Sequence, residues 1–334
     1  MYKFVLLSDK DRDFIFSVVS AKKGLRKAII EKDFWVCLTL DYLFNKSIYG
    51  KYFIFKGGTS LSKGFNLINR FSEDIDLILN CESLGITKQE LLKARSNTKQ
   101  DSFNKNVNNL AKDFIREKLL PDLKDGLFNL LKKEINVEID IADGQVINFY
   151  YPKLYGSESI LQFIKLEIGP LASLEPTQNI TIRSYVGEEM KDILEDNSFN
   201  VLTISPIRTF WEKATILHRE ANRLMEKDMP KRYSRHYYDL YMLGHSIYKD
   251  EALQNIALLK EVVTFKNKFY RDNWAKYEET LEKNFKLVPP DYRLKQLKSD
   301  YKNMQDMLYG NVPTIDQILK YLKQLETEIN GLNL

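Results

Sequence analysis

The sequence predicts a mixed α/β (α+β) protein with a mixed sheet flanked by helices, followed by a C-terminal helical bundle. Two short apolar runs, residues 52–55 and 74–79, are typical of strands. Apolar residues at helical spacing occupy residues 11–20 and 29–44. From residue 205 onward the pattern is almost entirely helical. We therefore expect two domains, residues 1–204 and residues 205–334.

Composition restricts the class of protein. With 334 residues, the chain is long enough for two domains that each have a core. Its 44% hydrophobic and 29% charged residues are ordinary for a soluble globular protein. No apolar run approaches the roughly 18 residues that span a bilayer, and the first residues are too acidic for a secretory signal. Cys37 and Cys81 fit no metal or redox spacing. We expect a cytoplasmic protein that does not bind membranes.

The most informative stretch is a glycine turn after the first predicted strand. Lys56-Gly57-Gly58-Thr59-Ser60 interrupts the apolar run. Paired glycines allow backbone N–H groups to approach a ligand closely. The spacing of Leu61, Phe65 and Ile68 predicts a short helix over residues 61–69. The turn is therefore a candidate phosphate-binding loop.

The next strand, residues 74–79, carries a pair of acids. Asp74 and Asp76 point to one face of the strand, and Ile75 and Leu77 point to the other. Two neighbouring carboxylates repel each other unless a cation lies between them. The pair therefore predicts a divalent-metal site that faces the glycine turn, although a lone Asp-x-Asp is usually only the solvated side of a strand.

The combination of these motifs resembles a known family. Residues 57–61, GGTSL, and residues 70–77, RFSEDIDL, resemble the nucleotidyltransferase signature, and more closely the AbiEii/AbiGii toxin family, which includes the mycobacterial MenT toxins. The resemblance implies a nucleotidyltransferase fold and Mg²⁺ or Mn²⁺ as the cofactor. It also implies a nucleoside triphosphate substrate, with GTP, CTP and UTP as the candidates.

A third metal-binding carboxylate is expected from the chemistry. In nucleotidyl transfer two metal ions bridge the triphosphate and activate the attacking hydroxyl, and a third acid usually completes the second site. Glu167 is the preferred candidate, and Asp140 and Glu138 are the alternatives. Each of these acids can equally be read as lying on the solvated side of a strand.

Further elements follow the same patterns. Three more strands are predicted at residues 135–141, 161–168 and 180–185, the first with Val137, Ile139 and Ile141 on its buried face. A long helix is expected over residues 87–120, with Pro121 ending it. The earlier run Glu31-Lys32-Asp33 is interpreted as the charged first turn of a helix packed on the sheet, with a phosphate contact by Lys32 as the alternative.

The second domain contributes two further motifs. Ser205 is a good N-cap and Pro206 a good first residue for a helix over residues 207–224. Its Arg-Thr-Phe-Trp-Glu-Lys run resembles a family segment that supplies an essential lysine, here Lys213. A helix beginning near Ser234 resembles the family's Arg-x-Tyr-Asp-Leu pattern, whose aspartate is needed for activity, here Asp239.

These acids and bases have simpler interpretations too. Asp239 could instead be an ion-pair partner of Arg232, Arg235 or Lys213, which would hold helices together. The two histidines of these helices, His218 and His236, have no metal spacing and are interpreted as ordinary helix residues, with His236 a candidate for a substrate contact.

The resemblance assigns roles to these residues. The metal ligands would be Asp74, Asp76 and Glu167, and the catalytic set adds Lys213 and Asp239. The nucleotide would be bound by the glycine turn, Arg70 and Lys213, with Gly57, Gly58, Thr59 and Ser60 forming the turn.

The resemblance also implies a biological role. The chain would be the toxin of a toxin–antitoxin or abortive-infection system, with the 3′ end of tRNA as acceptor and a cognate antitoxin as a partner. The alternatives are transfer to a small molecule or a protein hydroxyl, and a non-catalytic module that binds nucleotide or antitoxin.

Overall fold

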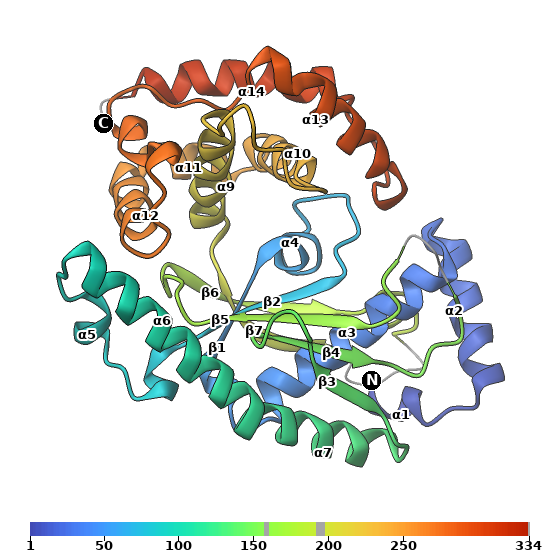
Figure 1. Cartoon of the computed structure of the whole chain (residues 1–334). Coiled ribbons are helices and arrows are strands. Elements are labelled where there is room, and N and C mark those ends of the chain that lie inside the picture. Colours follow the sequence, from blue (N-terminus) through green and yellow to red (C-terminus); the bar gives the residue numbers. More distant parts are fainter. Residues whose placement is uncertain (157–159, 192–197, 333–334) are drawn as a thin grey trace. The chain divides into compact units, whose positions relative to one another are not determined.

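The computed structural model describes residues 1–156, 160–191 and 198–332, and the chain divides into two compact units. Unit 1 consists of Met1–Gly64 and Ser72–Thr203, and unit 2 of Phe65–Phe71 and Ile204–Leu334 (Figure 1). The short segment Phe65–Phe71 therefore leaves unit 1 between the glycine turn and the Asp strand, whereas the sequence prediction assigned it to the first domain.

Unit 1 is built on a mixed sheet, as predicted, which among the described residues has seven strands in the order β3-β4-β5-β2-β1-β7-β6. Strand β2 pairs antiparallel with β1 and parallel with β5, which places it at the centre. The four other predicted strands are present with shifted ends as β1, β3, β5 and β6. Strand β4 was not predicted, because a short run without alternation carries little signal. The strands are β1 Phe53–Lys56, β2 Asp74–Leu79, β3 Asn136–Ile139, β4 Val146–Tyr150, β5 Ile164–Gly169, β6 Thr177–Arg183 and β7 Ser198–Ile204.

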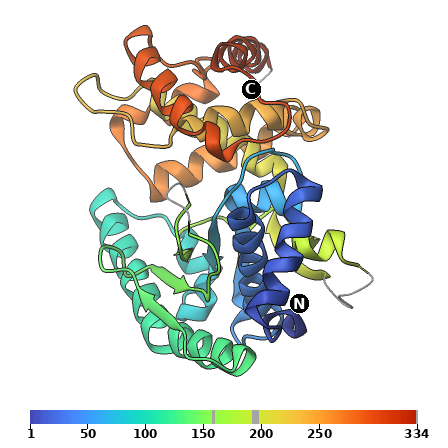
Figure 2. The same cartoon turned by 90° about the vertical axis from the view of Figure 1, so that its right-hand side faces the viewer.

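Helices pack on one face of this sheet. The aromatic ring of Trp35 on α3 lies 6.1 Å from Phe149 and 5.8 Å from Tyr151, and the same apolar core takes in α1, α2, α6 and α7. Figure 2 shows the dark blue N-terminal helices alongside the strands. The helical elements of unit 1 are α1 Tyr2–Val5, α2 Asp9–Lys23, α3 Lys27–Asn45, η1 Gly50–Tyr52, α4 Gly57–Thr59, η2 Ser60–Gly64, η3 Cys81–Leu84, α5 Lys88–Leu92, α6 Asn97–Phe114, η4 Ile115–Leu119, α7 Leu120–Leu131 and α8 Tyr185–Glu189.

The helix expected over residues 61–69 lies elsewhere. It begins at Gly57 and ends at Gly64, as α4 followed by the π-helical turn η2. The φ of Gly57 is +82°, a value that glycine adopts without cost, and it turns the chain from β1 directly into the helix. The glycine turn is therefore the start of the helix and not a loop before it.

Three other predictions in unit 1 are wrong. The helix expected over residues 87–120 is divided into α5 and α6, because residues 93–96 are not helical. Pro121 does not end a helix but lies in the first turn of α7, where its missing N–H needs no partner. Ile141 is fully exposed, because β3 already ends at Ile139. There the Asp140 carboxylate accepts hydrogen bonds from the N–H groups of the next turn, at 2.9 and 3.2 Å, and so replaces the strand by a turn.

Unit 2 is a bundle of helices around α9 and α10, which pack against each other. Helices α11 and α12 pack on α9, and α13 and α14 pack on α10. Ser205 is the N-cap of α9 and Pro206 its first residue, as predicted. The elements are α9 Pro206–Ala221, α10 Ser234–Gly244, α11 Tyr248–Gln254, α12 Ile256–Phe269, η5 Asn273–Ala275, η6 Tyr277–Leu281, α13 Asp291–Asn303, η7 Gln305–Met307 and α14 Ile315–Asn330. Among the described residues, no helix is both long and apolar enough to cross a membrane.

Candidate functional site

The two aspartates lie on the face of β2 opposite its apolar core. Ile75 and Leu77 have no exposed area, whereas Asp74 and Asp76 are half-buried. In the parallel pair with β5, Asp74 is opposite Lys165 and Asp76 is opposite Glu167. Residues in register share a face, so the centre of the sheet carries three acids and one base on one side.

Asp74 has the environment of a cation ligand. Its Oδ1 atom is buried and has no hydrogen-bond partner among the described residues. Burial, followed by the negative charges of Asp76, Glu73 and Glu167, raises the pKa of Asp74 to about 6. A buried carboxylate oxygen is normally satisfied by a donor or a cation. The residues present therefore fit a divalent metal ion.

The third carboxylate stays a prediction, because the nearest candidate already has a lysine partner. Glu167 lies opposite Asp76, but its Oε1 atom is 2.5 Å from Lys165 Nζ. Asp140 accepts a hydrogen bond from Asn148, and Glu138 on β3 and Asp140 directly after it belong to an edge of the sheet, separated from β2 by β4 and β5. Within the part of the chain that the structure describes, no group of three or more His, Cys, Asp or Glu residues is arranged to hold a metal ion.

The helix formed by α4 and η2, Gly57–Gly64, which we call the glycine helix, contacts strand β2. A Cβ atom added at Gly57 would lie 1.9 Å from Asp76 Oδ2, so the backbone touches that carboxylate. Thr59 donates its hydroxyl to the carbonyl of Asp74 at 2.5 Å, and Ser60 donates to Gly57 at 2.8 Å. These hydroxyls therefore stabilise the turn, and a phosphate contact by Thr59 or Ser60 stays a prediction. The N–H groups at the start of the helix are what this segment can offer an anion.

Unit 2 holds a separate cluster of charges around Asp239. Arg70 donates through Nε to Asp239 Oδ1 at 2.7 Å and through Nη2 to Oδ2 at 3.0 Å. Lys213 donates to Oδ2 at 2.8 Å. The Asp239 side chain has no exposed area. Burial alone would raise its pKa, but Arg70 and Lys213 hold the pKa of Asp239 well below its usual value. Asp239 is therefore bound by Arg70 and Lys213, and two cations share one carboxylate.

His236 extends this cluster. Its Nδ1 atom lies 3.1 Å from Lys213 Nζ. Burial, and then the charges of Lys213 and Arg235, lower the pKa of His236 well below its usual value. A neutral ring can accept a hydrogen bond from the ammonium group through Nδ1. His236 and Asp239 together orient Lys213, and a substrate contact by His236 stays a prediction.

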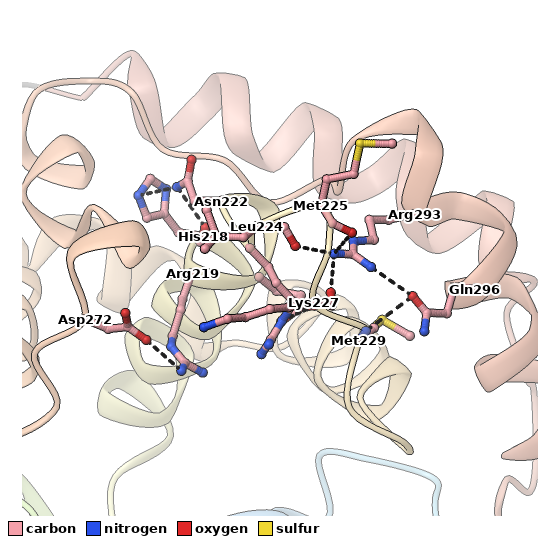
Figure 3. Close-up of polar contacts among 12 residues, drawn as sticks. His218, Arg219, Asn222, Leu224, Met225, Lys227, Met229, Asp272, Arg293 and Gln296 are labelled. Atoms are coloured by element: carbon pink, nitrogen blue, oxygen red, sulfur yellow. Dashed lines mark hydrogen bonds and ion pairs between the residues drawn. The ribbon is translucent and has the colours of Figure 1, made fainter.

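The loop between α9 and α10 is fixed on α13 (Figure 3). Arg293 donates through Nη2 to the carbonyl oxygens of Leu224, Met225 and Lys227, and Gln296 accepts from the N–H of Met229. This network holds the loop that connects the helix of Lys213 with the helix of Asp239. His218 is structural, because Lys276 and Lys286 bind its two ring nitrogens through their backbones.

One charged residue beside the site was not predicted from the sequence. Glu73 is 2% exposed, and its Oε2 atom lies 2.8 Å from Lys32 Nζ. Alternation along the strand could have found it, since Glu73 has the same parity as Ile75 and Leu77 and so belongs to the buried face. A buried acid needs a partner.

The match to a protein family agrees with the sequence motifs. A protein-family model described as "Nucleotidyl transferase AbiEii toxin, Type IV TA system" matches residues 39–321. Among solved structures, the chain is similar to MenT4, a nucleotidyltransferase toxin from Mycobacterium tuberculosis, with 14% identity, a TM-score of 0.46, and coverage of 94% of this chain and 98% of that chain. It is also similar to JHP933 from Helicobacter pylori, with 16% identity, a TM-score of 0.35, and coverage of 92% and 99%. None of the curated proteins compared with the chain matches it.

Proposed function

The chain belongs to the AbiEii family of nucleotidyl transferase toxins of type IV toxin–antitoxin systems, and from this premise we propose that it transfers a nucleotide from a nucleoside triphosphate to the 3′ end of tRNA in the cytoplasm. The proposed cofactor is Mg²⁺ or Mn²⁺. The family implies an antitoxin as the biological counterpart of the chain.

One observation carries the proposal. Asp74 and Asp76 share one face of β2, a buried oxygen of Asp74 has no partner among the described residues, and the glycine helix touches Asp76. Two neighbouring carboxylates repel each other, so their position beside the N–H groups at a helix start favours a bound cation and a phosphate.

Each of these groups in unit 1 has a proposed role in the reaction. The acceptor hydroxyl attacks the α-phosphorus, its oxygen forms the new P–O bond, and pyrophosphate leaves. Asp74 and Asp76 would hold the metal, with Glu167 as the candidate third ligand, and bound metal would supply charge stabilisation and a more acidic hydroxyl. The backbone from Gly57 to Ser60 would hold the triphosphate oxygens. Catalysis then rests on positioning and electrostatics.

In unit 2 we propose that Lys213 neutralises negative charge on the triphosphate. Arg70 and Lys213 carry two positive charges and Asp239 carries one negative charge, so these three side chains have one net positive charge. Asp239 orients Lys213 by a 2.8 Å hydrogen bond. Only three residues separate Arg70 from Asp74 in the sequence. Asp239 is then a positioning residue for Lys213, and its buried carboxylate is not available to the acceptor.

Labelled transfer tests the proposal. Purified protein is incubated with each α-labelled nucleoside triphosphate, Mg²⁺ or Mn²⁺, and total tRNA. A parallel sample uses tRNA whose terminal diol has been oxidised with periodate, which destroys the 3′ acceptor and leaves the rest of the molecule intact. We expect label in the intact tRNA and none in the oxidised tRNA.

The other outcomes separate the rival functions. Equal label in both tRNA samples contradicts transfer to the 3′ end. Label in protein or in a small molecule, with none in RNA, indicates a different hydroxyl acceptor. Triphosphate binding without turnover on any acceptor indicates a non-catalytic module and overturns the proposal.

A further inference from the structure

Three consecutive charged residues are buried inside α3. Glu31, Lys32 and Asp33 are 0%, 0% and 2% exposed. They were expected in the first turn of a helix, but α3 begins at Lys27, so they lie in its second turn. Charged side chains are almost never fully buried unless they are paired, and the partner of each one therefore matters.

Lys32 fixes the residue that precedes Asp74. Its Nζ atom lies 2.8 Å from Glu73 Oε2 and donates to the carbonyl oxygen of Leu161 at 2.8 Å. The N–H of Leu161 in turn donates to Glu73 Oε2 at 3.0 Å. These three contacts close a triangle that holds Glu73, and the next residue in the chain is Asp74. With no exposed area, Lys32 cannot contact a phosphate.

Asp33 fixes the glycine helix. Its Oδ1 atom lies 2.9 Å from the Nζ atom of Lys63, which belongs to η2, the continuation of the helix that begins at Gly57. Its Oδ2 atom accepts a hydrogen bond from the N–H of Tyr185 at 2.6 Å, and Lys63 Nζ lies 3.7 Å above the ring of Tyr185. The Lys63 side chain is 6% exposed.

Glu31 makes contacts of the same kind with a different segment. Its carboxylate accepts hydrogen bonds from the N–H groups of Leu154 at 2.7 Å and Tyr155 at 3.1 Å. Neither residue belongs to β2 or to the glycine helix. Glu31 is therefore a matched control for its two neighbours, with the same helix, the same burial and comparable hydrogen bonding.

We propose that Lys32 and Asp33 are positioning residues for the nucleotide site, an inference that rests on the proposed function. Lys32 holds Glu73 in place, and Glu73 fixes the backbone at Asp74. Lys32 thereby orients the carboxylates that would bind the metal. Asp33 holds Lys63, which belongs to the glycine helix. Asp33 thereby fixes the position of the helix that would bind the triphosphate. Replacing a buried ion pair by apolar residues is often neutral for stability. The contribution that we assign to these pairs is therefore a fixed orientation of Asp74 and of the glycine helix.

The test compares Lys32→Met, Asp33→Asn and the control Glu31→Met in the full chain. Electron paramagnetic resonance measures Mn²⁺ binding without nucleotide, and transfer kinetics give the KM for the triphosphate. Loss of a residue that orients a metal ligand typically weakens metal binding by 10- to 100-fold. We expect a loss of at least about tenfold in Mn²⁺ affinity for Lys32→Met. Asp33→Asn should raise the KM for the triphosphate and leave Mn²⁺ affinity unchanged, and Glu31→Met should change neither.

A double variant separates positioning from folding. Lys32→Met leaves Glu73 buried without its cation, which lowers Tm, whereas Lys32→Met/Glu73→Leu removes both charges and should regain Tm. The inference requires that Mn²⁺ affinity stays low in this double variant. If affinity returns with Tm, or if Lys32→Met and Asp33→Asn behave as Glu31→Met does, Lys32 and Asp33 are only structural. A wild-type chain that neither binds Mn²⁺ nor transfers nucleotide refutes the proposed function instead.

Discussion

Gly57 lies in contact with the carboxylate of Asp76, so closely that a Cβ atom at position 57 would stand 1.9 Å from Asp76 Oδ2. The glycine pair was expected to allow close approach of a ligand. Its first member allows close approach of the Asp76 carboxylate to the start of a helix. The glycine pair and the Asp-x-Asp pair are therefore in direct contact.

This contact predicts the effect of Gly57→Ala. The added methyl group would displace the Asp76 carboxylate, and a displacement of about 1 Å can cost roughly 100-fold in rate. The matched control is Gly85→Ala, because Gly85 also has a positive φ, +75°, but nothing lies within 4 Å of its Cβ position. Both variants should lose about 1–2 kcal/mol of stability from backbone strain, and only Gly57→Ala should lose nucleotidyl transfer. Equal transfer rates for the two variants would refute the role given to this contact.

Lys213 and Lys266 offer a second matched pair. Both are lysines of unit 2 whose ammonium groups are held by polar partners, Lys266 by the carbonyl of Glu212 at 3.1 Å and the hydroxyl of Thr215 at 2.6 Å. We expect Lys213→Met to slow transfer by about 100-fold or more, as loss of a charge-stabilising donor does, and Lys266→Met to retain most of the rate. Single-turnover transfer assays measure both. Similar losses in the two variants would show that Lys213 has no special part in the reaction.

The cluster around Asp239 predicts a large loss of stability on Asp239→Asn. The change leaves two buried cations without their carboxylate, and removing one partner of a buried pair typically costs about 3–5 kcal/mol. The control is Asp316→Asn, because the ion pair of Asp316 with Lys298 is exposed and such pairs contribute about 0–1 kcal/mol. Denaturant unfolding of both variants measures the difference. Equal midpoints would contradict the structural role of Asp239.

Glu31 predicts a pH dependence of stability. Burial raises the pKa of Glu31 from 4.5 to about 7, although its backbone hydrogen bonds to Leu154 and Tyr155 oppose the shift. Between these values the folded chain holds a proton that the unfolded chain releases, so stability falls as the pH rises. The unfolding free energy of the wild type should therefore fall relative to Glu31→Gln by up to about 3 kcal/mol from pH 4.5 to pH 7. Parallel stability curves for the two proteins over this range would contradict the assignment.

Much of unit 1 could be predicted because its strands obey simple periodicity. Alternation in residues 74–79 placed the two aspartates on one face, and the structure confirms this arrangement. Ile141 shows where periodicity fails, because the hydrogen bonds of a local Asp turn ended the strand before the apolar pattern did.

The contacts of the charged residues could not be predicted in the same way. Alternation gives the face on which Glu73 lies but not its partner, Lys32, which comes from a helix 41 residues away in the sequence. Arg70 was assigned to a nucleotide, and the structure pairs it with Asp239, 169 residues away. Such pairs depend on tertiary packing, which no local pattern encodes.

The most direct test of the central claim is the rate of nucleotide transfer to tRNA by the wild type and by Asp76→Asn, measured side by side with Mg²⁺. Asn keeps the size of the side chain and removes its charge, so folding should persist, as equal Tm values would show. We predict that the wild type labels tRNA and that Asp76→Asn is slower by about 100-fold or more. Equal rates would contradict the claim that the acids of β2 hold the catalytic metal.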